Sequence, residues 1–321
     1  MPAISSTAPG KVILLGEHAV VYRRPAIAVP VDQVRARAIV TPKPGAARGV
    51  VHIQAPNVGL ESDLRDLPGD HPLVVALRGV FAAAGVTDPP AFNLRVASTI
   101  PVASGLGSGA AVSVAIIRAV SEFLARPLSN EQVSALAFEV EKLHHGTPSG
   151  IDNTVITYAM PVYFKQAGET GEEEQDLIEK FRVANPFTIL IADTGVPSPT
   201  AVAVGDVRRE WQANPGFYEK LFDAIADIVR SARQAIERGR IDSLGALMNR
   251  NHELLCKIGV SSPELDTLVA AALRGGASGA KLSGGGRGGN MIALASPQNA
   301  PALSDILLES GAKNVITTVV R

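Results

Sequence analysis

The residues of this sequence best suited to chemistry lie in two glycine-rich segments. The first covers residues 104–111, Ser-Gly-Leu-Gly-Ser-Gly-Ala-Ala, and stands between a β-like run and a long apolar segment without Gly or Pro. Glycines bring bare N–H groups close to a ligand, and a helix start adds unpaired donors and partial positive charge. The segment therefore predicts a phosphate site; the alternative is a tight, buried strand-to-helix turn.

The second glycine-rich segment, residues 281–290, begins with Lys281 and contains Arg287. So many glycines carry an entropic cost that an ordinary turn does not need, and this favours close backbone approach to a ligand. Neither segment is a standard nucleotide motif. Residues 105–110 and 284–289 fit the dinucleotide patterns only loosely, and the P-loop is absent, since Ala280 precedes Lys281 and Leu282 follows it.

Three charged residues outside these segments are also suited to chemistry. Lys11 precedes an apolar run, Glu141 lies late in an expected helix, and Asp152 follows a Pro/Gly turn, where it is either a helix cap or a catalytic carboxylate. Two anion-binding loops, a lysine and two separated carboxylates suggest phosphoryl transfer. That chemistry needs carboxylates for Mg²⁺, a base or orienter for the acceptor hydroxyl, and cations for the developing charge.

Other polar residues have two interpretations each. Glu17 and His18 end an apolar run, where they are either functional or exposed caps, and Thr200 either caps a helix or donates to a ligand. His144 and His145 are adjacent histidines, a residue type that binds zinc. They do not predict a zinc site, because HExxH is absent and neighbours in sequence do not share a helix face.

The elements that must position these residues alternate between strands and helices. The patterns predict strands at 12–15, 26–31, 34–41, 50–54, 91–98, 162–164, 187–192, 279–283, 290–295 and 313–320. They predict helices at 71–84, 108–124, 130–144, after 149, in four segments over 200–273, and at 300–309. The order indicates an α+β chain with two domains, 1–185 and 186–321.

Composition limits the function classes. The chain has 321 residues and is 46% hydrophobic, with a net charge of −1, so nothing predicts a nucleic acid or a membrane as partner. The single cysteine, Cys256, is expected to be a small buried side chain, and no internal disulfide is possible. With no signal peptide recognised, we expect a cytoplasmic protein.

Four blocks in order resemble the GHMP-superfamily kinases, and within them the mevalonate kinase family. The blocks are residues 9–22 (PGKVILLGEHAVVY), 101–111 (PVASGLGSGAA), 145–153 (HGTPSGIDN) and 281–290 (KLSGGGRGGN). The resemblance implies a two-domain GHMP-kinase fold, with an N-terminal ribosomal-protein-S5-domain-2-like domain and a C-terminal ferredoxin-like domain. It implies an enzyme that uses ATP and Mg²⁺ to phosphorylate the C5 hydroxyl of mevalonate, and we expect a homodimer.

The resemblance also implies a role for each matching residue. Asp152 is the base or orienter, Lys11 stabilises its carboxylate and the developing charge, and Glu141 and Ser108 bind the metal. The mevalonate-binding residues are His18, Thr200, Ser283, Gly284, Gly285 and Gly286. The ATP-binding residues are Pro101, Val102, Ala103, Ser104, Gly105, Leu106, Gly107, Ser108, Gly109, Ala110 and Ala111.

The chain departs from the family pattern at Gly109 and, in the second glycine-rich segment, at Ser283, Gly285, Arg287 and Asn290. Gly109 stands where the family has a serine that often binds Mg²⁺, which predicts weaker Mg²⁺ affinity with activity retained. Arg287 stands where glycine is common, and we expect it to point to solvent rather than to the phosphates. The alternative functions are another GHMP small-molecule kinase, for phosphomevalonate or a sugar, and a catalytically silent nucleotide-binding paralogue.

Overall fold

The computed structural model describes residues 2–101, 104–145, 149–167, 176–198 and 200–321. Its chain divides into two compact units, each assembled from separate stretches of sequence. The first unit comprises residues 1–11 and 34–159, and the second comprises residues 12–33 and 160–321. The long strands β1 (Ile4–Leu15) and β2 (Ala26–Pro42) contribute residues to both units.

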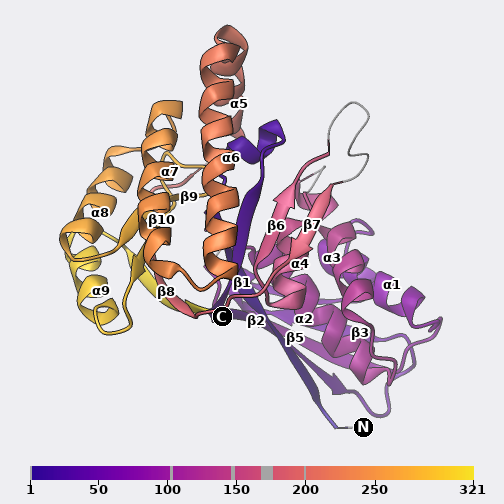
Figure 1. Cartoon of the computed structure of the whole chain (residues 1–321). Helices are drawn as coiled ribbons and strands as arrows, with labels where there is room; N and C mark the ends of the chain where they lie inside the picture. The colour runs from indigo at the N-terminus through magenta and orange to yellow at the C-terminus, as the bar shows by residue number, and fades with distance from the viewer. Residues whose placement is uncertain (1, 102–103, 146–148, 168–175, 199) are drawn as a thin grey trace. The chain divides into compact units, whose positions relative to one another are not determined.

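The first unit combines a mixed sheet with helices. Its strands run in the order β4-β3-β5-β2, with β3 (Val51–Ala55) parallel to β5 (Phe92–Ser98) and antiparallel to β4 (Leu60–Asp63). Side chains alternate between buried and accessible along β3 and β5, so each strand presents one apolar face. The helices α1 (Pro72–Ala83), α2 (Ser108–Phe123), α3 (Asn130–His145) and α4 (Ile151–Tyr158) pack against one another, and α2 contacts β5 (Figure 1).

The second unit contains an antiparallel four-stranded sheet in the order β11-β8-β10-β9. These strands are β8 (Phe187–Asp193), β9 (Gly279–Ser283), β10 (Asn290–Ala295) and β11 (Asn314–Val320). Every residue of β9 and β10 is buried, which explains why these runs show no alternation in sequence. Two shorter strands, β6 (Val162–Lys165) and β7 (Leu177–Lys180), extend the N-terminal part of β2.

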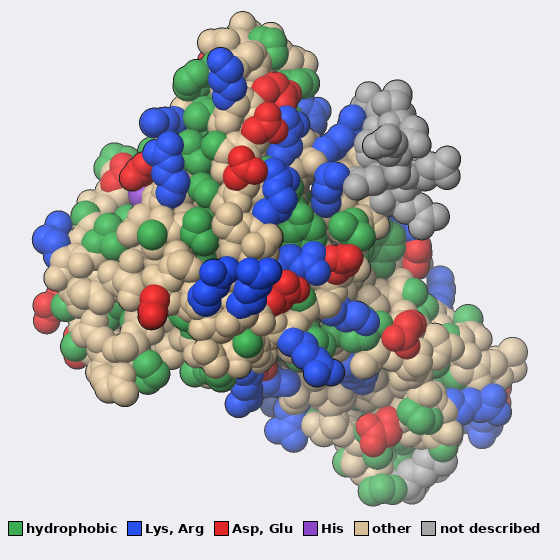
Figure 2. Space-filling view, in the orientation of Figure 1, with side chains coloured by type: hydrophobic (Ala, Val, Ile, Leu, Met, Phe, Trp, Pro, Cys, Tyr) green, Lys and Arg blue, Asp and Glu red, His purple; other side chains and the backbone are tan. Residues whose placement is uncertain are grey.

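Five helices complete this unit: α5 (Thr200–Ala213), α6 (Pro215–Glu237), α7 (Leu244–Ile258), α8 (Pro263–Arg274) and α9 (Ala300–Glu309). Helices α7, α8 and α9 pack on the four-stranded sheet, and α6 packs on α5 and α7 (Figure 1). Basic and acidic side chains are interspersed over α5 and α6 (Figure 2), partly as neighbours one turn apart such as Asp206–Arg209 and Asp227–Arg230.

Short 3₁₀ turns join these elements: η1 (Ala19–Tyr22), η2 (Pro56–Val58), η3 (Leu64–Asp66) and η4 (Ile241–Ser243). The α+β class with two sheets confirms the sequence prediction. Most elements agree with the predicted ranges, but β1 begins at Ile4 and not at residue 12, so Lys11 lies within this strand and does not precede it. None of the helices that the structure describes is both long enough and apolar enough to cross a membrane.

Three other expectations about the fold were wrong or incomplete. Residues 26–31 and 34–41 form one continuous strand, because Pro30 lies between the part of β2 that pairs with β6 and the part that pairs with β5. The sequence pattern missed β4 and β7. Cys256 is exposed, not buried. The predicted division at residue 185 stays a prediction.

Candidate active site

Lys11 and Asp152 form an ion pair in the first unit. The Lys11 ammonium lies 3.0 Å from Oδ1 of Asp152, and these side chains are 11% and 27% exposed. Lys11 belongs to β1, while Asp152 lies in the first turn of α4, where the helix dipole favours a negative charge. The side chain of Thr154 donates to the carbonyl of Gly150 and secures the start of α4. The structure therefore brings together the two residues predicted to be catalytic.

The first glycine-rich loop lies directly against this pair. The backbone N–H of Lys11 donates to the carbonyl of Leu106 at 3.0 Å, so the loop is fixed to β1. Gly107 caps α2 with φ of 71°, and Gly105 also has positive φ, conformations that favour glycine. Ser108 is the first residue of α2. The predicted strand, loop and helix are thus confirmed, and the unpaired donors of the α2 N-terminus lie beside Lys11.

Two of the residues predicted to bind ATP, Val102 and Ala103, lie outside the described residues. The other members of the predicted set are part of the described loop and of the first turn of α2. Ser104 donates to the carbonyl of Pro101 at 2.8 Å, which closes the turn before the glycines.

Glu141 is a buried carboxylate on α3, with only 3% of its surface exposed. The pKa of Glu141 is raised to about 7, mainly by burial and also by the Asp152 carboxylate, while Lys11 opposes both effects. These interactions place the Glu141 charge near that of the Lys11–Asp152 pair. The three residues therefore form one electrostatic cluster, although β1 is far in sequence from α3 and α4.

His18 and the second glycine-rich loop meet in the second unit. His18 is 4% exposed, and its Nε2 lies 2.9 Å from the carbonyl oxygen of Gly285. Burial is the main cause that lowers the pKa of His18, so the ring is neutral at pH 7. The interpretation of His18 as an exposed cap is therefore wrong.

The second loop is also held by the start of α5. A Cβ at Gly285 would lie 2.8 Å from Oγ1 of Thr200, so this close approach requires glycine. Ser198 donates to the carbonyl of Gly286 at 2.6 Å. These contacts bring Thr200, Gly285 and Gly286 together, as the predicted set requires. Ser283 instead donates to the carbonyl of Ile13 at 2.7 Å and thereby anchors the loop's first turn.

Arg287 forms an ion pair with Asp206 of α5, and its side chain is 37% exposed. Our expectation that Arg287 points to solvent was therefore incomplete, because its charge ties the glycine loop to α5.

Sequence reasoning missed a fully buried ion pair beneath this loop. The ammonium of Lys281 contacts the carboxylate of Glu17, and these side chains are 0% and 1% exposed. Burial raises the pKa of Glu17 and lowers that of Lys281, while their mutual attraction opposes both shifts. Each is a lone charge in an apolar run, which is the signal that could have indicated a buried partner.

Two other features of the second unit do not coincide with the predicted residues. A surface cavity of about 480 Å³ is lined by residues of β8, β11 and α9, among them Thr188, Asp305 and Val319, and includes no predicted site residue. His252, Cys256 and Asp266 lie close together. Nδ1 of His252 accepts from the Leu282 N–H at 3.3 Å, so the neutral ring carries its proton on Nε2 and offers no lone pair to a metal ion.

Comparison with known proteins agrees with this arrangement. Residues 72–160 match the GHMP kinases N terminal domain, and residues 219–313 match the GHMP kinases C terminal domain. A mevalonate kinase of Pyrococcus abyssi is 34% identical over 334 residues, covering 96% of this chain and 93% of that protein. A mevalonate kinase of Aeropyrum pernix is 36% identical, covering 91% and 88%.

Solved structures give the same result. The crystal structure of L. major mevalonate kinase in complex with R-mevalonate superposes with a TM-score of 0.81 and 31% identity, covering 99% of this chain and 95% of that one. The Methanococcus jannaschii mevalonate kinase, at 24% identity, has the same fold with a TM-score of 0.81 over 99% and 98%. With relatives this similar over nearly its whole length, the chain belongs to the mevalonate kinase family of the GHMP kinases.

Proposed function

We propose that this chain is an ATP-dependent kinase that transfers the γ-phosphoryl group directly to the C5 hydroxyl of mevalonate, giving 5-phosphomevalonate. The observation that carries the proposal is the Lys11–Asp152 ion pair, 3.0 Å long, beside the glycine loop at the start of α2. The choice of mevalonate as the acceptor is supported by the relatives, because a mevalonate kinase matches over 96% of this chain.

Asp152 and Lys11 have different roles at the acceptor hydroxyl. The Asp152 carboxylate accepts the hydroxyl proton or orients the hydroxyl for attack, and Lys11 contacts that carboxylate and orients it. Lys11 and the N–H groups of residues 104–111 also offset the negative charge that develops on the transferred group. In the second unit, His18, Thr200 and residues 283–286 bind mevalonate.

The residues in the first unit fit Mg²⁺. Glu141 and Ser108 offer carboxylate and hydroxyl oxygens, the ligands that this hard cation prefers. The pKa of about 7 for Glu141 reflects a buried charge that a divalent cation would stabilise. When bound, Mg²⁺ neutralises charge on the ATP phosphates. Because residue 109 is glycine, we expect Gly109→Ser to lower the Mg²⁺ concentration needed for half-maximal activity.

The first experiment is a coupled assay of ADP release with ATP and Mg²⁺. Mevalonate, phosphomevalonate and galactose are compared as acceptors, for the wild type and for Asp152→Asn. Turnover with mevalonate alone, and a loss of about 10²-fold or more in the variant, are the expected results. Turnover with one of the other acceptors would overturn mevalonate as the substrate and would indicate another GHMP kinase activity. ATP binding without turnover on any acceptor indicates a silent paralogue.

Three further expectations belong to this proposal. They are the domain division 1–185 and 186–321, a homodimer, and a cytoplasmic location. Light scattering on the purified full chain tests the homodimer directly, since it reports the mass in solution.

A further inference from the structure

The backbone at His18 adopts an unusual conformation. Its φ is 58° and its ψ is −49°, and the N–H of Ala19 donates to the carbonyl of Glu17 at 2.6 Å. These features define a γ-turn with positive φ, which is rare and strained for a residue with a side chain. Strain of this kind persists only where the surrounding structure holds it, and it is concentrated at functional sites.

Contacts from β9 and the loop that follows it hold this turn from one side. Lys281 of β9 donates to the carboxylate of Glu17 and, at 2.6 Å, to the carbonyl of Leu282. Gly285 accepts from the His18 ring at 2.9 Å. An ion pair removed from water is costly to break, because the remaining partner would be an uncompensated buried charge. The pair therefore fixes the residue before His18 to β9.

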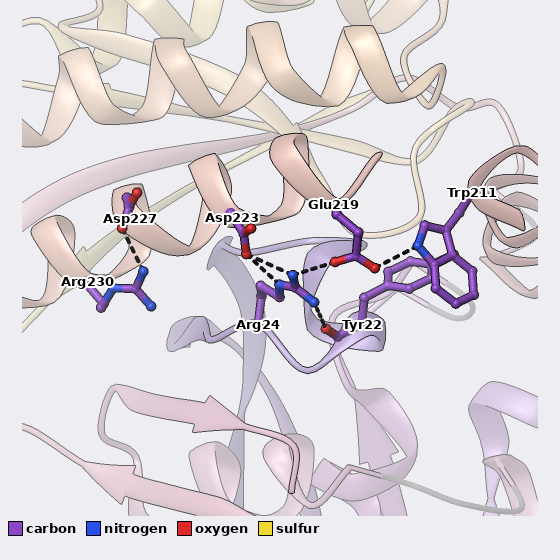
Figure 3. A network of polar contacts seen from close by, with 7 residues as sticks. All are labelled: Tyr22, Arg24, Trp211, Glu219, Asp223, Asp227 and Arg230. Atoms are coloured by element: carbon purple, nitrogen blue, oxygen red, sulfur yellow. Dashed lines mark hydrogen bonds and ion pairs between the residues drawn. The ribbon is translucent and has the colours of Figure 1, made fainter. Parts of the chain in front are cut away.

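The chain after His18 is held separately by α6 (Figure 3). Arg24 donates to Asp223 at 2.8 and 3.0 Å, contacts Glu219, and donates to the carbonyl of Tyr22. The ring of Tyr22 stacks on Phe222 with centroids 4.1 Å apart. The strained turn thus lies between two anchors that do not share a residue.

The contact with Gly285 also determines which ring nitrogen of His18 carries the proton. A carbonyl oxygen only accepts, so Nε2 must be the donor, and in a neutral ring Nδ1 then carries a lone pair. Nδ1 is buried and has no hydrogen-bond partner among the residues that the structure describes. A buried acceptor without a partner favours a ligand that supplies a donor, such as a hydroxyl.

We infer that Glu17 and Lys281 are positioning residues: their buried ion pair holds His18 in the γ-turn and in the Nε2–H form, so that Nδ1 accepts a hydrogen bond from a hydroxyl of the acceptor. This inference rests on the proposed function for the identity of the acceptor. The protonation form of the free protein, however, is independent of any substrate.

The test removes both charges together, because each single substitution would leave an unpaired buried charge. The variant Glu17→Gln/Lys281→Met is compared with the wild type by ¹⁵N spectroscopy of the histidine rings, with His18→Gln used to assign the signal. The wild type is expected to show Nε2–H alone, and the variant a mixture of the two neutral forms. The KM for mevalonate should rise roughly tenfold, the equivalent of one hydrogen bond, with the KM for ATP within about twofold.

A second pair in the same unit provides the matched control. Arg233→Met/Glu179→Gln removes a partly exposed ion pair between α6 and β7, and it should leave the His18 signal and both KM values unchanged. A folded Glu17→Gln/Lys281→Met variant whose His18 remains entirely Nε2–H overturns the inference, as does an equal rise in both KM values. If wild-type protein does not phosphorylate mevalonate, the proposed function fails, and the ¹⁵N comparison still decides the positioning role.

Discussion

Gly107 lies so close to Lys11 that a Cβ built on Gly107 would be 2.9 Å from Cγ of that lysine. The same Cβ would be 2.9 Å from Cδ1 of Ile156, so Gly107→Ala must displace the Lys11 side chain, the Ile156 side chain or the loop. We expect kcat at saturating ATP to fall by about 10²-fold, the usual scale for a misplacement of about 1 Å at a reacting group. Steady-state kinetics with mevalonate as acceptor measures this effect.

Gly105→Ala is the matched control for that substitution. Gly105 has a φ of 74°, close to the 71° of Gly107, but a Cβ there would meet no atom of the described residues within 4 Å. Both variants should lose about 1 kcal/mol of stability through the positive φ. If Gly105→Ala weakens ATP binding, the KM for ATP should rise while kcat stays nearly unchanged. Equal losses of kcat in the two variants would contradict a specific role for the Gly107–Lys11 contact.

Glu141 should make stability depend on pH in the absence of Mg²⁺. Its folded-state pKa of about 7 lies above the ordinary value of 4.5, so the folded state binds the proton more tightly. The stabilisation is complete below pH 4.5 and is lost as the pH rises through 7, a change on the order of 3 kcal/mol. Glu141→Gln removes this dependence, so the variant should be more stable than wild type at pH 8 and similar at pH 5. Urea unfolding at the two pH values measures the difference.

Glu139 supplies the control for this experiment. It lies on the same helix, is 56% exposed and pairs with Lys142, so Glu139→Gln should not change the pH dependence. A stability gain from Glu141→Gln that is the same at pH 5 and pH 8 would refute a buried, titrating carboxylate.

The edge strand β9 is protected by side chains of α7. The N–H of Ala280 donates to Oδ1 of Asn249 at 2.8 Å, and the N–H of Leu282 donates to His252. Asn249→Ala leaves a buried strand N–H without its acceptor and should cost about 1–3 kcal/mol. Asn249→Asp retains the acceptor oxygen and should lose much less. Chemical unfolding of the two variants measures this difference. Equal losses of unfolding free energy would show that the hydrogen bond accepted by Oδ1 of Asn249 does not stabilise the protein.

Ala159 ends α4 in a left-handed conformation, with φ of 48° and ψ of 42°. Its side chain is exposed, so Ala159→Gly removes the steric cost without removing packing. We expect stabilisation of about 0.5–1 kcal/mol, measured as a higher Tm. The same substitution at Ala82, an exposed position inside α1, should destabilise by a similar amount. Destabilisation by both changes would contradict the strain at Ala159.

Local sequence patterns were sufficient for most elements and for the glycine loops. Helix α2 follows its glycine loop at the predicted residue, because the loop and the apolar run adjoin in sequence. Features that depend on contacts between distant residues could not be predicted from local sequence patterns. The continuity of β2 through Pro30 depends on which neighbour pairs with each part of the strand. The exposure of Cys256 depends on which face of α7 is buried.

In the candidate site, too, the individual residues were predictable from the sequence but the contacts between distant residues were not. Lys11, Asp152 and Glu141 are predicted by type and motif, but their electrostatic coupling requires three separate elements to pack together. The buried partner of Glu17 is 264 residues away, and no local pattern identifies Lys281 as that partner.

That separation also determines the order in which this protein can be completed on the ribosome. Residues 12–33 are synthesised before the residues that hold them, because Glu17 and His18 form their contacts with residues 264 and 267 positions later in the chain. Contacts of such high sequence separation form late in folding. Residues 12–33 must therefore wait until the second glycine-rich loop has been synthesised, with an acidic side chain and a histidine in water, before their binding conformation exists.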